Sequence, residues 1–362
     1  MIVDTDILII GGGPAGLAAA TVAIKKGAKT VLVDDSLELG GQLVKQTHKF
    51  FGSEMEYAGV RGIDIPKIFL DQIQDNSLFT SYSRTSAMGI YDDNVVTALE
   101  KEEIMHKFRP KAIIVATGAR EKMIPFPNND LPGIYGAGAV QTLMNVHGVK
   151  PGENVLMVGA GNIGLIVSYQ LLQAGVNVEA VIEGMDRVGG YWVHASKIRR
   201  LGIPIHTRHT ILEAIGDDFV EAAIIAEIDE NWQVIHGTKR EVEVDTICLA
   251  VGLAPLSDFF YQTGCDIKYI RELSGDVPVR DKHLMTTKPG LFVAGDSAGI
   301  EEASSAMIEG FIAGEAATEF AGIKATDFDG QIQKYWQELH ELRSGPVGQY
   351  IRNGIQKVQL SK

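Results

Sequence analysis

The segment ILIIGGGPAG, residues 7–16, runs from four apolar residues straight into a glycine-rich turn. Gly11, Gly13 and Gly16 in that turn match the spacing G-x-G-x-x-G. In this pattern the first glycine makes a tight turn, the second lets the backbone approach a pyrophosphate, and the third lets a helix pack closely on a strand. The next segment, 17–27, has a helical pattern, and its first turn would offer free N–H groups to phosphates. The sequence therefore predicts a dinucleotide-binding βαβ unit at its start.

A carboxylate lies where such a unit binds ribose. Residues 29–33 form the next apolar strand, and Asp34 follows it, 23 positions after Gly11. In dinucleotide-binding units a carboxylate about 20 residues after the first glycine hydrogen-bonds the ribose hydroxyls. The alternative interpretation of these residues is a structural turn beside a surface aspartate.

The same pattern recurs in the middle of the chain. A strand-like segment, NVLMV, leads into GAGNIG at 159–164, and a helical segment and a further strand, 176–182, follow. Glu183 then lies 24 positions after Gly159. A carboxylate here binds a ribose 2′-hydroxyl and repels a 2′-phosphate, and Arg187 is not part of a basic cluster. This favours NAD(H) over NADP(H), and the alternative is a vestigial fold that binds nothing.

The remaining segments indicate how the two units are arranged along the chain. Strand-like segments 104–118 and 244–252 both end in small residues and are followed by proline-containing stretches that suit domain crossings. A third strand, 290–296, precedes helical patterns in 304–322 and 328–342. We predict an α/β fold of two nested Rossmann-like domains. The predicted boundaries are 1–119 with 253–325 for the first domain, 120–252 for the second, and 326–362 for a C-terminal helix and tail.

Composition excludes several functional classes. The 362-residue chain has a formal net charge of −13, which disfavours nucleic-acid binding. Its two cysteines, Cys248 and Cys265, form no CxxC, so the sequence predicts no disulfide framework, metal site or iron–sulfur cluster of its own. Cys248 lies in the apolar run TICLAV and is expected in the core. Without a signal peptide or a membrane span of about 18 apolar residues, we expect a cytoplasmic protein.

Two nested nucleotide folds, together with ATG at 116–118 and FVAGD at 292–296, resemble the flavoproteins with two dinucleotide-binding domains. The resemblance implies FAD in the first fold and NAD(P)H in the inserted one. It implies that the GGQL loop, starting at Gly40, runs along the FAD molecule and that Asp296 binds the ribitol hydroxyls. It further implies that a helix beginning near Ala303 points its amino end at the flavin ring, where it would stabilise negative charge.

Spacing and resemblance together assign a set of cofactor-binding residues, but no catalytic side chain and no metal ligand. For FAD these residues are Gly11, Gly13, Pro14, Ala15, Gly16, Asp34, Asp35, Gly40, Gly41, Gln42, Ala116, Thr117, Gly118, Gly295, Asp296, Ala303 and Ser304. For NAD(H) they are Gly159, Gly161, Asn162, Ile163, Gly164 and Glu183.

One branch of these flavoproteins fits better than the others. The thioredoxin-reductase branch is similar in length and in GGQL, but its CxxC is replaced here by IYGAGAVQT, so disulfide reduction is not expected. The stretches ATGAREKMIPFPNNDLPGIYGAGAVQTLM and EGMDRVGGY resemble the nucleotide-binding alpha subunits of heteromeric sarcosine oxidase, opine oxidase, hydrogen cyanide synthase and dye-linked proline dehydrogenase. This resemblance implies an oligomer with flavoprotein and iron–sulfur partner subunits.

Several other residues keep two interpretations. Lys45, Thr47 and His48 could approach the flavin, but a solvated loop is favoured. His206 and His209 are expected to face opposite sides of a strand, which argues against a metal site. Glu301 and Glu302 are interpreted as helix-start carboxylates or as a charge that tunes the flavin. Tyr191 and Trp192 are interpreted as packing residues or as a stacking surface.

The function expected from all these features is an FAD-dependent, NAD(H)-linked oxidoreductase. It would be one subunit of an assembly that oxidises an amine, an imino acid or a similar small metabolite. One alternative is a stand-alone NADH:acceptor oxidoreductase, and another is a non-catalytic nucleotide-binding subunit.

Overall fold

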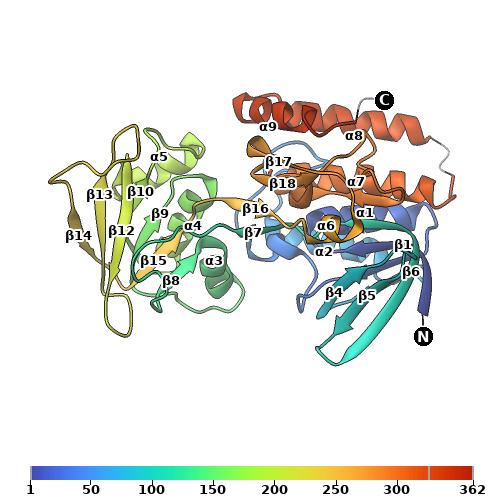
Figure 1. The fold of residues 1–362 in the computed structure, drawn as a ribbon, viewed down its shortest axis with the longest axis horizontal. Helices are drawn as coiled ribbons and strands as arrows, with labels where there is room; N and C mark the ends of the chain where they lie inside the picture. Colours follow the sequence, from blue (N-terminus) through green and yellow to red (C-terminus); the bar gives the residue numbers. More distant parts are fainter. Residues whose placement is uncertain (1, 325–326, 361–362) are drawn as a thin grey trace. The chain divides into compact units, whose positions relative to one another are not determined.

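A computed structural model describes residues 2–324 and 327–360, so the predicted domain boundary at 325 and 326 lies outside the described residues. The chain divides into two compact units, which we describe separately (Figure 1). The first unit contains the chain up to Arg120 and again from Ala254 onward, and the second is Glu121–Leu253. The short strands β7 (Ala119–Glu121) and β16 (Leu253–Pro255) pair where the chain passes from one unit to the other.

The first unit is built on a seven-stranded sheet of order β3-β2-β1-β6-β5-β4, with β19 paired to β6. β1, β2, β3, β6 and β19 are parallel neighbours, whereas β4 and β5 add an antiparallel extension. Strand β1 is buried on both faces, because Ile7 and Ile9 face one core and Leu8 and Ile10 the other, and this explains its continuous apolar run. The strands are β1 (Ile2–Ile10), β2 (Thr30–Val33), β3 (Phe79–Tyr82), β4 (Thr85–Ile90), β5 (Val96–Glu100), β6 (Ile104–Val115) and β19 (Leu291–Val293).

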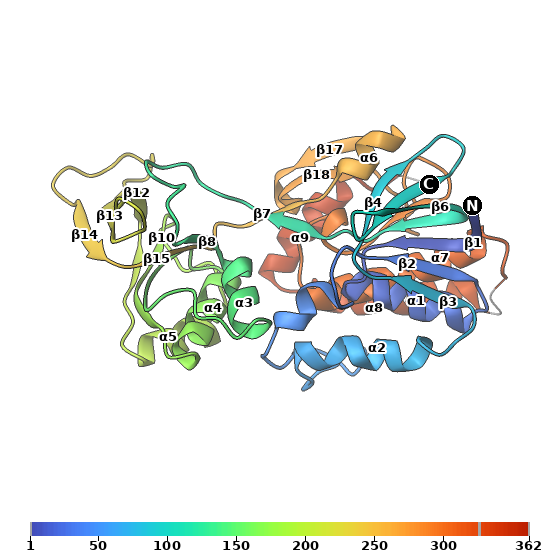
Figure 2. The same cartoon turned by 90° about the horizontal axis from the view of Figure 1, so that it is seen from below.

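Helices α1, α2, α7 and α8 cover one face of this sheet, and α6 with the β17–β18 hairpin covers the other (Figure 2). Helix α7 approaches α1 closely because small residues face each other: a methyl group on Gly310 would lie 2.2 Å from the Ala15 carbonyl oxygen. The elements are α1 (Pro14–Lys25), α2 (Ile65–Ile73), α6 (Asp258–Thr263), α7 (Ala303–Phe320), α8 (Phe328–Leu342), β17 (Ile267–Ile270) and β18 (Gly275–Pro278). Single-turn helices are η1 (Gly41–Lys45), η2 (Gly62–Asp64), η3 (Arg271–Leu273) and η4 (Gly295–Ala298).

The second unit has a five-stranded parallel sheet of order β11-β10-β9-β15-β8. Helices α3, α4 and α5 pack on one face, and an antiparallel sheet of order β12-β13-β14 packs on the other. These elements are β8 (Ile134–Gly136), α3 (Ala137–Asn145), β9 (Asn154–Val158), α4 (Asn162–Gln173), β10 (Asn177–Glu183), α5 (Trp192–Arg200), β11 (Ile205–Thr207), β12 (His209–Ile215), β13 (Ala222–Glu227), β14 (Arg240–Glu243) and β15 (Thr246–Leu249). The α/β fold with two Rossmann-like sheets is therefore confirmed.

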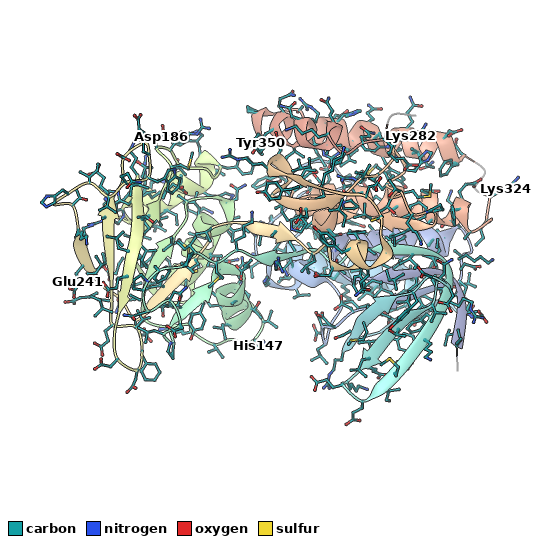
Figure 3. All side chains as sticks on the ribbon, in the orientation of Figure 1. His147, Asp186, Glu241, Lys282, Lys324 and Tyr350 are labelled. Carbon is teal, nitrogen blue, oxygen red and sulfur yellow. The ribbon has the colours of Figure 1, made fainter. Side chains whose placement is uncertain are left out.

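The C-terminal region contains more structure than the sequence predicts. The amphipathic helix predicted at 328–342 is confirmed as α8, and a further helix, α9 (Pro346–Gln356), follows it. Ile351 and Ile355 of α9 pack on the cluster around Leu273, while Tyr350 of the same helix stays half exposed (Figure 3). Among the helices of the described residues, none is long and apolar enough to cross a membrane.

Candidate functional site

The first glycine turn joins β1 to α1, and its three glycines have different surroundings. Gly11 has a φ of +105°, and a methyl group there would lie 2.3 Å from the Ala116 carbonyl oxygen. A methyl group on Gly16 would lie 1.8 Å from the Gly11 oxygen. A methyl group on Gly13, by contrast, would be 3.8 Å from the nearest neighbouring atom, the Gly41 Cα. The first and third glycines are therefore required by the fold, and the second leaves space at the helix start.

The carboxylate of Asp34 points at this turn. Its Oδ2 accepts a hydrogen bond from the Gly12 N–H at 2.6 Å, and its Oδ1 accepts one from the Ser36 N–H at 2.8 Å. Asp34 is only 8% exposed, so the alternative interpretation of a surface aspartate is wrong. The exposed neighbour is Asp35.

The GGQL segment lies against the same turn. The Gly40 N–H donates to the Gly12 carbonyl at 2.8 Å, and a methyl group on Gly41 would lie 2.8 Å from the Gly13 Cα. Gln42 is exposed on η1, but Lys45 at the end of that helix is buried. For Lys45 the solvated-loop interpretation is therefore wrong, because η1 folds its side chain inward.

His48 and Thr47 continue the chain after this turn. Both side chains are partly buried, and the His48 ring stacks on Phe50 with their centroids 5.9 Å apart. The preference for a solvated loop therefore does not describe these two residues either.

Two further strand ends reach the first turn. Ala116 follows β6 and donates its N–H to the Ile10 carbonyl at 2.8 Å, and Thr117 and Gly118 continue the chain from there. Gly295 follows β19 with a φ of +72°, and a methyl group there would lie 3.0 Å from the Ala15 Cβ. The ATG and FVAGD segments therefore meet the glycine turn at the carboxyl ends of parallel strands, where open α/β sheets bind ligands.

Asp296 lies next to this junction, and its side chain is partly buried. Burial raises its pKa to about 7, and the neighbouring Glu301 and Glu309 carboxylates act in the same direction. The Asp296 Oδ1 accepts a hydrogen bond from the Glu301 N–H at 3.3 Å, which opposes that rise. Helix α7 begins just beyond, at Ala303 and the buried Ser304, with Glu302 at its N-cap.

Glu301 belongs to a buried ion-pair cluster that the sequence interpretation missed. The Arg343 Nε and Nη2 donate to the two Glu301 carboxylate oxygens at 2.9 and 2.6 Å, and Nη2 also contacts Glu309 Oε1 at 2.7 Å. Glu309 in turn accepts the Gly295 N–H on Oε2 at 3.0 Å. Arg343 at the end of α8 is therefore connected, through Glu309, to the glycine of FVAGD.

Charge balance in this cluster depends on Arg343. Burial disfavours its guanidinium, but attraction to Glu301 and Glu309 outweighs burial and raises the Arg343 pKa. Burial, together with repulsion from Glu301, raises the pKa of Glu309, and Arg343 opposes that rise. Arg280 is also buried, and burial lowers its pKa.

The second glycine turn repeats the geometry of the first inside the second unit. Methyl groups on Gly159 and Gly164 would lie 2.3 Å from the Ala250 oxygen and 2.1 Å from the Gly159 oxygen, respectively. A methyl group on Gly161 would have no neighbouring atom of the described residues within 4 Å. Glu183 Oε2 accepts the Ala160 N–H at 2.8 Å, which aims its carboxylate at the turn.

The residues after Gly161 form the start of α4. The side chain of Asn162 accepts the Tyr191 N–H at 2.8 Å, so the GGY segment lies beside the second turn. Ile163 is 39% exposed at the same helix start. Trp192 is 75% exposed, so its interpretation as a packing residue is wrong, whereas Tyr191 is 48% exposed and its ring lies 6.3 Å from that of His194.

The two histidines also differ from expectation. Arg208 has a φ of +54° and separates β11 from β12, so His206 and His209 do not lie on one continuous strand. Their rings lie 5.2 Å apart, and the prediction that they face opposite sides is wrong. Within the described residues, no group of three metal-ligating side chains is brought together.

Both cysteines lie in the interior of their own units. Cys248 is fully buried in the second unit, and Cys265 is buried in the first, so the core position predicted for Cys248 is confirmed. Burial raises the pKa of both thiols, which disfavours the thiolate that disulfide exchange requires.

Comparison with known proteins gives a family and a set of relatives. Residues 5–310 match the family model described as pyridine nucleotide-disulphide oxidoreductase. The alpha subunit of sarcosine oxidase from Corynebacterium sp. (strain P-1) is 29% identical over 89% of this chain and 33% of that protein. An opine oxidase subunit from Agrobacterium tumefaciens (strain Ach5) is 26% identical over 86% of this chain and 65% of its own length. The chain thus spans less than two thirds of either relative.

Solved structures share the fold. The crystal structure of L-proline dehydrogenase from P. horikoshii matches with a TM-score of 0.71 and 24% identity, covering 94% of this chain and 59% of that one. Thioredoxin reductase from T. acidophilum matches with a TM-score of 0.71 and 20% identity, covering 87% of this chain and 98% of that one.

Proposed function

Because this chain belongs to the pyridine nucleotide-disulphide oxidoreductase family, we propose that it is an FAD-dependent, NAD(H)-linked subunit of a larger dehydrogenase or oxidase. The relatives from Corynebacterium and Agrobacterium are subunits of oxidases. Sarcosine and proline, which appear in the names of its relatives and structural neighbours, are a secondary amine and an imino acid. We propose a substrate of this chemical class for the assembly, with flavoprotein and iron–sulfur subunits as partners.

The observation that carries the proposal is the matched construction of the two glycine turns. In each, the first and third glycines are packed against backbone and the second faces space. In each, a carboxylate on the next strand is held toward the turn by a backbone N–H, Asp34 in the first and Glu183 in the second. This arrangement fits a pyrophosphate at the helix start and a ribose at the carboxylate.

Each unit supplies its own contacts to its cofactor. In the first unit, FAD would be held by the α1 start, Asp34, the GGQL turn and Asp296. In the second, NAD(H) would be held by the α4 start and Glu183. Bound cofactors supply the hydride and electron transfer, which requires orientation and exclusion of water rather than a protein nucleophile. The buried thiols are consistent with a family member that does not reduce disulfides.

The absorption spectrum of the purified protein tests the first half of the proposal. We expect flavin bands, either on purification or after FAD is added, and anaerobic bleaching of those bands by NADH in preference to NADPH. A protein that stays colourless after FAD is added would overturn the flavin assignment and favour a non-catalytic nucleotide-binding subunit. A flavoprotein that neither NADH nor NADPH bleaches would overturn the nicotinamide link.

Isolation of the native protein from its source tests the second half. We expect it to co-purify in fixed ratio with other subunits, and the complex to oxidise small amines or imino acids. A protein of one chain that passes electrons from NADH directly to an acceptor would instead support the stand-alone oxidoreductase.

A further inference from the structure

We propose that Trp232, in the hairpin between β13 and β14, is the surface on which the adenine of the dinucleotide stacks in the second unit. The proposal rests on the function proposed above, and it adds the residue that recognises the base. Trp232 lies far from Glu183 in the sequence, and no motif singles it out. The structure places its ring against the residue that follows Glu183.

The contact between Trp232 and Gly184 is close and specific. A methyl group on Gly184 would lie 2.6 Å from Cζ3 and 2.7 Å from Cη2 of the indole. Because Gly184 has no side chain, the Trp232 indole can occupy the position that a Cβ atom would otherwise take. Despite the contact, Trp232 remains 60% exposed. One edge of the indole is therefore fixed while much of its surface stays open.

The backbone holds Trp232 in a conformation that a bulky residue rarely adopts. Its φ is +62°, in the left-handed region, where large side chains are outliers. The turn around it is tied by Asp229, whose Oδ1 accepts the N–H groups of Asn231 and Gln233 at 2.9 and 2.8 Å. The Trp232 N–H donates to the Asp229 carbonyl at 3.1 Å. A small residue would fit this position with less strain, so the cost is consistent with a binding role for the ring.

Nucleotide chemistry connects Trp232 to Glu183. The two Glu183 oxygens accept N–H groups from Ala160 at 2.8 Å and Met185 at 2.9 Å, which orients the carboxylate between the glycine turn and Gly184. A ribose held through its 2′-hydroxyl carries adenine on the adjacent carbon, C1′. The base would therefore lie close to Glu183, beside the Trp232 indole that contacts the next residue, Gly184. Stacking on an aromatic ring is a common and strong mode of base recognition.

Binding of dinucleotide fragments to the full protein tests the proposal. The probes are ADP-ribose, which contains the adenine, and nicotinamide mononucleotide, which does not. We expect W232A to bind ADP-ribose about tenfold more weakly than the wild type in calorimetry, and W232F to stay within about threefold. Nicotinamide mononucleotide should bind all three proteins equally. We also expect ADP-ribose to quench tryptophan fluorescence in the wild type and in W336F, whose substitution lies on α8, but much less in W232F.

The outcomes separate this proposal from the proposed function. If the wild type binds ADP-ribose and W232A binds it equally well, the stacking role is wrong and the function stands. If the wild type binds neither ADP-ribose nor NADH, the proposed function fails and this inference fails with it. Gly184→Ala provides a second test, since its added methyl group displaces the indole; unchanged ADP-ribose affinity in that variant would also contradict the stacking role.

Discussion

Arg343 gives the sharpest test of how the C-terminal helix supports the first unit. Its guanidinium bridges Glu301 and Glu309, and the side chains of the three residues are 3%, 11% and 5% exposed, respectively. Replacing Arg343 with Met keeps most of the side-chain volume but removes the guanidinium that pairs with both buried carboxylates, so that the neighbouring Arg280 is the buried cation that remains to them. Breaking a buried pair in this way costs about 3–5 kcal/mol of unfolding free energy, a large part of the roughly 5–15 kcal/mol typical of a folded protein.

A mutant cycle distinguishes charge loss from lost packing. Adding Glu301→Gln and Glu309→Gln to Arg343→Met removes the two unpaired carboxylates and leaves Arg280 as the buried charge of the cluster. Replacing buried ionic groups by neutral ones of similar volume is often tolerated. We therefore expect the triple variant to recover about 2 kcal/mol or more relative to Arg343→Met. Urea unfolding followed by circular dichroism measures both differences.

An exposed arginine provides the matched control. Arg109 is 52% exposed and lies 3.8 Å from Asp4, so Arg109→Met should change the unfolding free energy by less than about 1 kcal/mol. The stabilising role of the Arg343 charge is refuted if Arg343→Met is no more destabilising than Arg109→Met. It is also refuted if the triple variant is less stable than Arg343→Met alone.

Three further predictions concern the cofactor residues. Because burial raises the Asp296 pKa to about 7, ionisation of this carboxyl lowers the stability of the fold as pH rises from about 4 to 7. In flavin-free protein we therefore expect Asp296→Asn to be more stable than the wild type, by a difference that grows from pH 5 to 7 and levels off at about 4 kcal/mol. A pH-independent difference in urea unfolding would contradict this. Gly164→Ala should lower the free energy of unfolding by about 1–3 kcal/mol, because its methyl group would collide with the Gly159 carbonyl oxygen. Gly161→Ala should keep the stability of the wild type but bind NADH more weakly. Equal losses of stability in the two variants, measured by thermal unfolding, would disprove the different roles of the two glycines. Glu183→Ala should weaken NADH binding at least tenfold and reduce the preference of the protein for NADH over NADPH. Calorimetry that finds this preference unchanged would show that Glu183 does not bind the ribose.

The glycine turns could be predicted from sequence because their requirements are local. A strand, three glycines at fixed spacing and a carboxylate after the next strand all lie within one βαβ unit. The structure then shows why a side chain is excluded at the first and third glycines of each turn. At Gly11, for example, the Ala116 carbonyl oxygen leaves no room for one. Similarly, the strands and helices with strong apolar patterns form where the sequence predicts them.

Two of the misses depend on contacts between distant segments, and a third depends on a single unusual backbone angle. Arg343 lies 34 positions from Glu309 on another helix, and no periodicity connects them. The left-handed φ of Arg208 interrupts what reads as one strand, and this brings His206 and His209 together. Helix α9 has few apolar residues, and those it has become meaningful only when they pack on the η3 region.

The central claim is that two dinucleotides bind with their pyrophosphates at the starts of α1 and α4. A crystal structure of the protein with FAD and ADP-ribose tests it most directly. We predict one pyrophosphate beside Gly13 and one beside Gly161, with ribose hydroxyls on Asp34 and Glu183. A structure in which either pyrophosphate lies away from its glycine turn would contradict the claim.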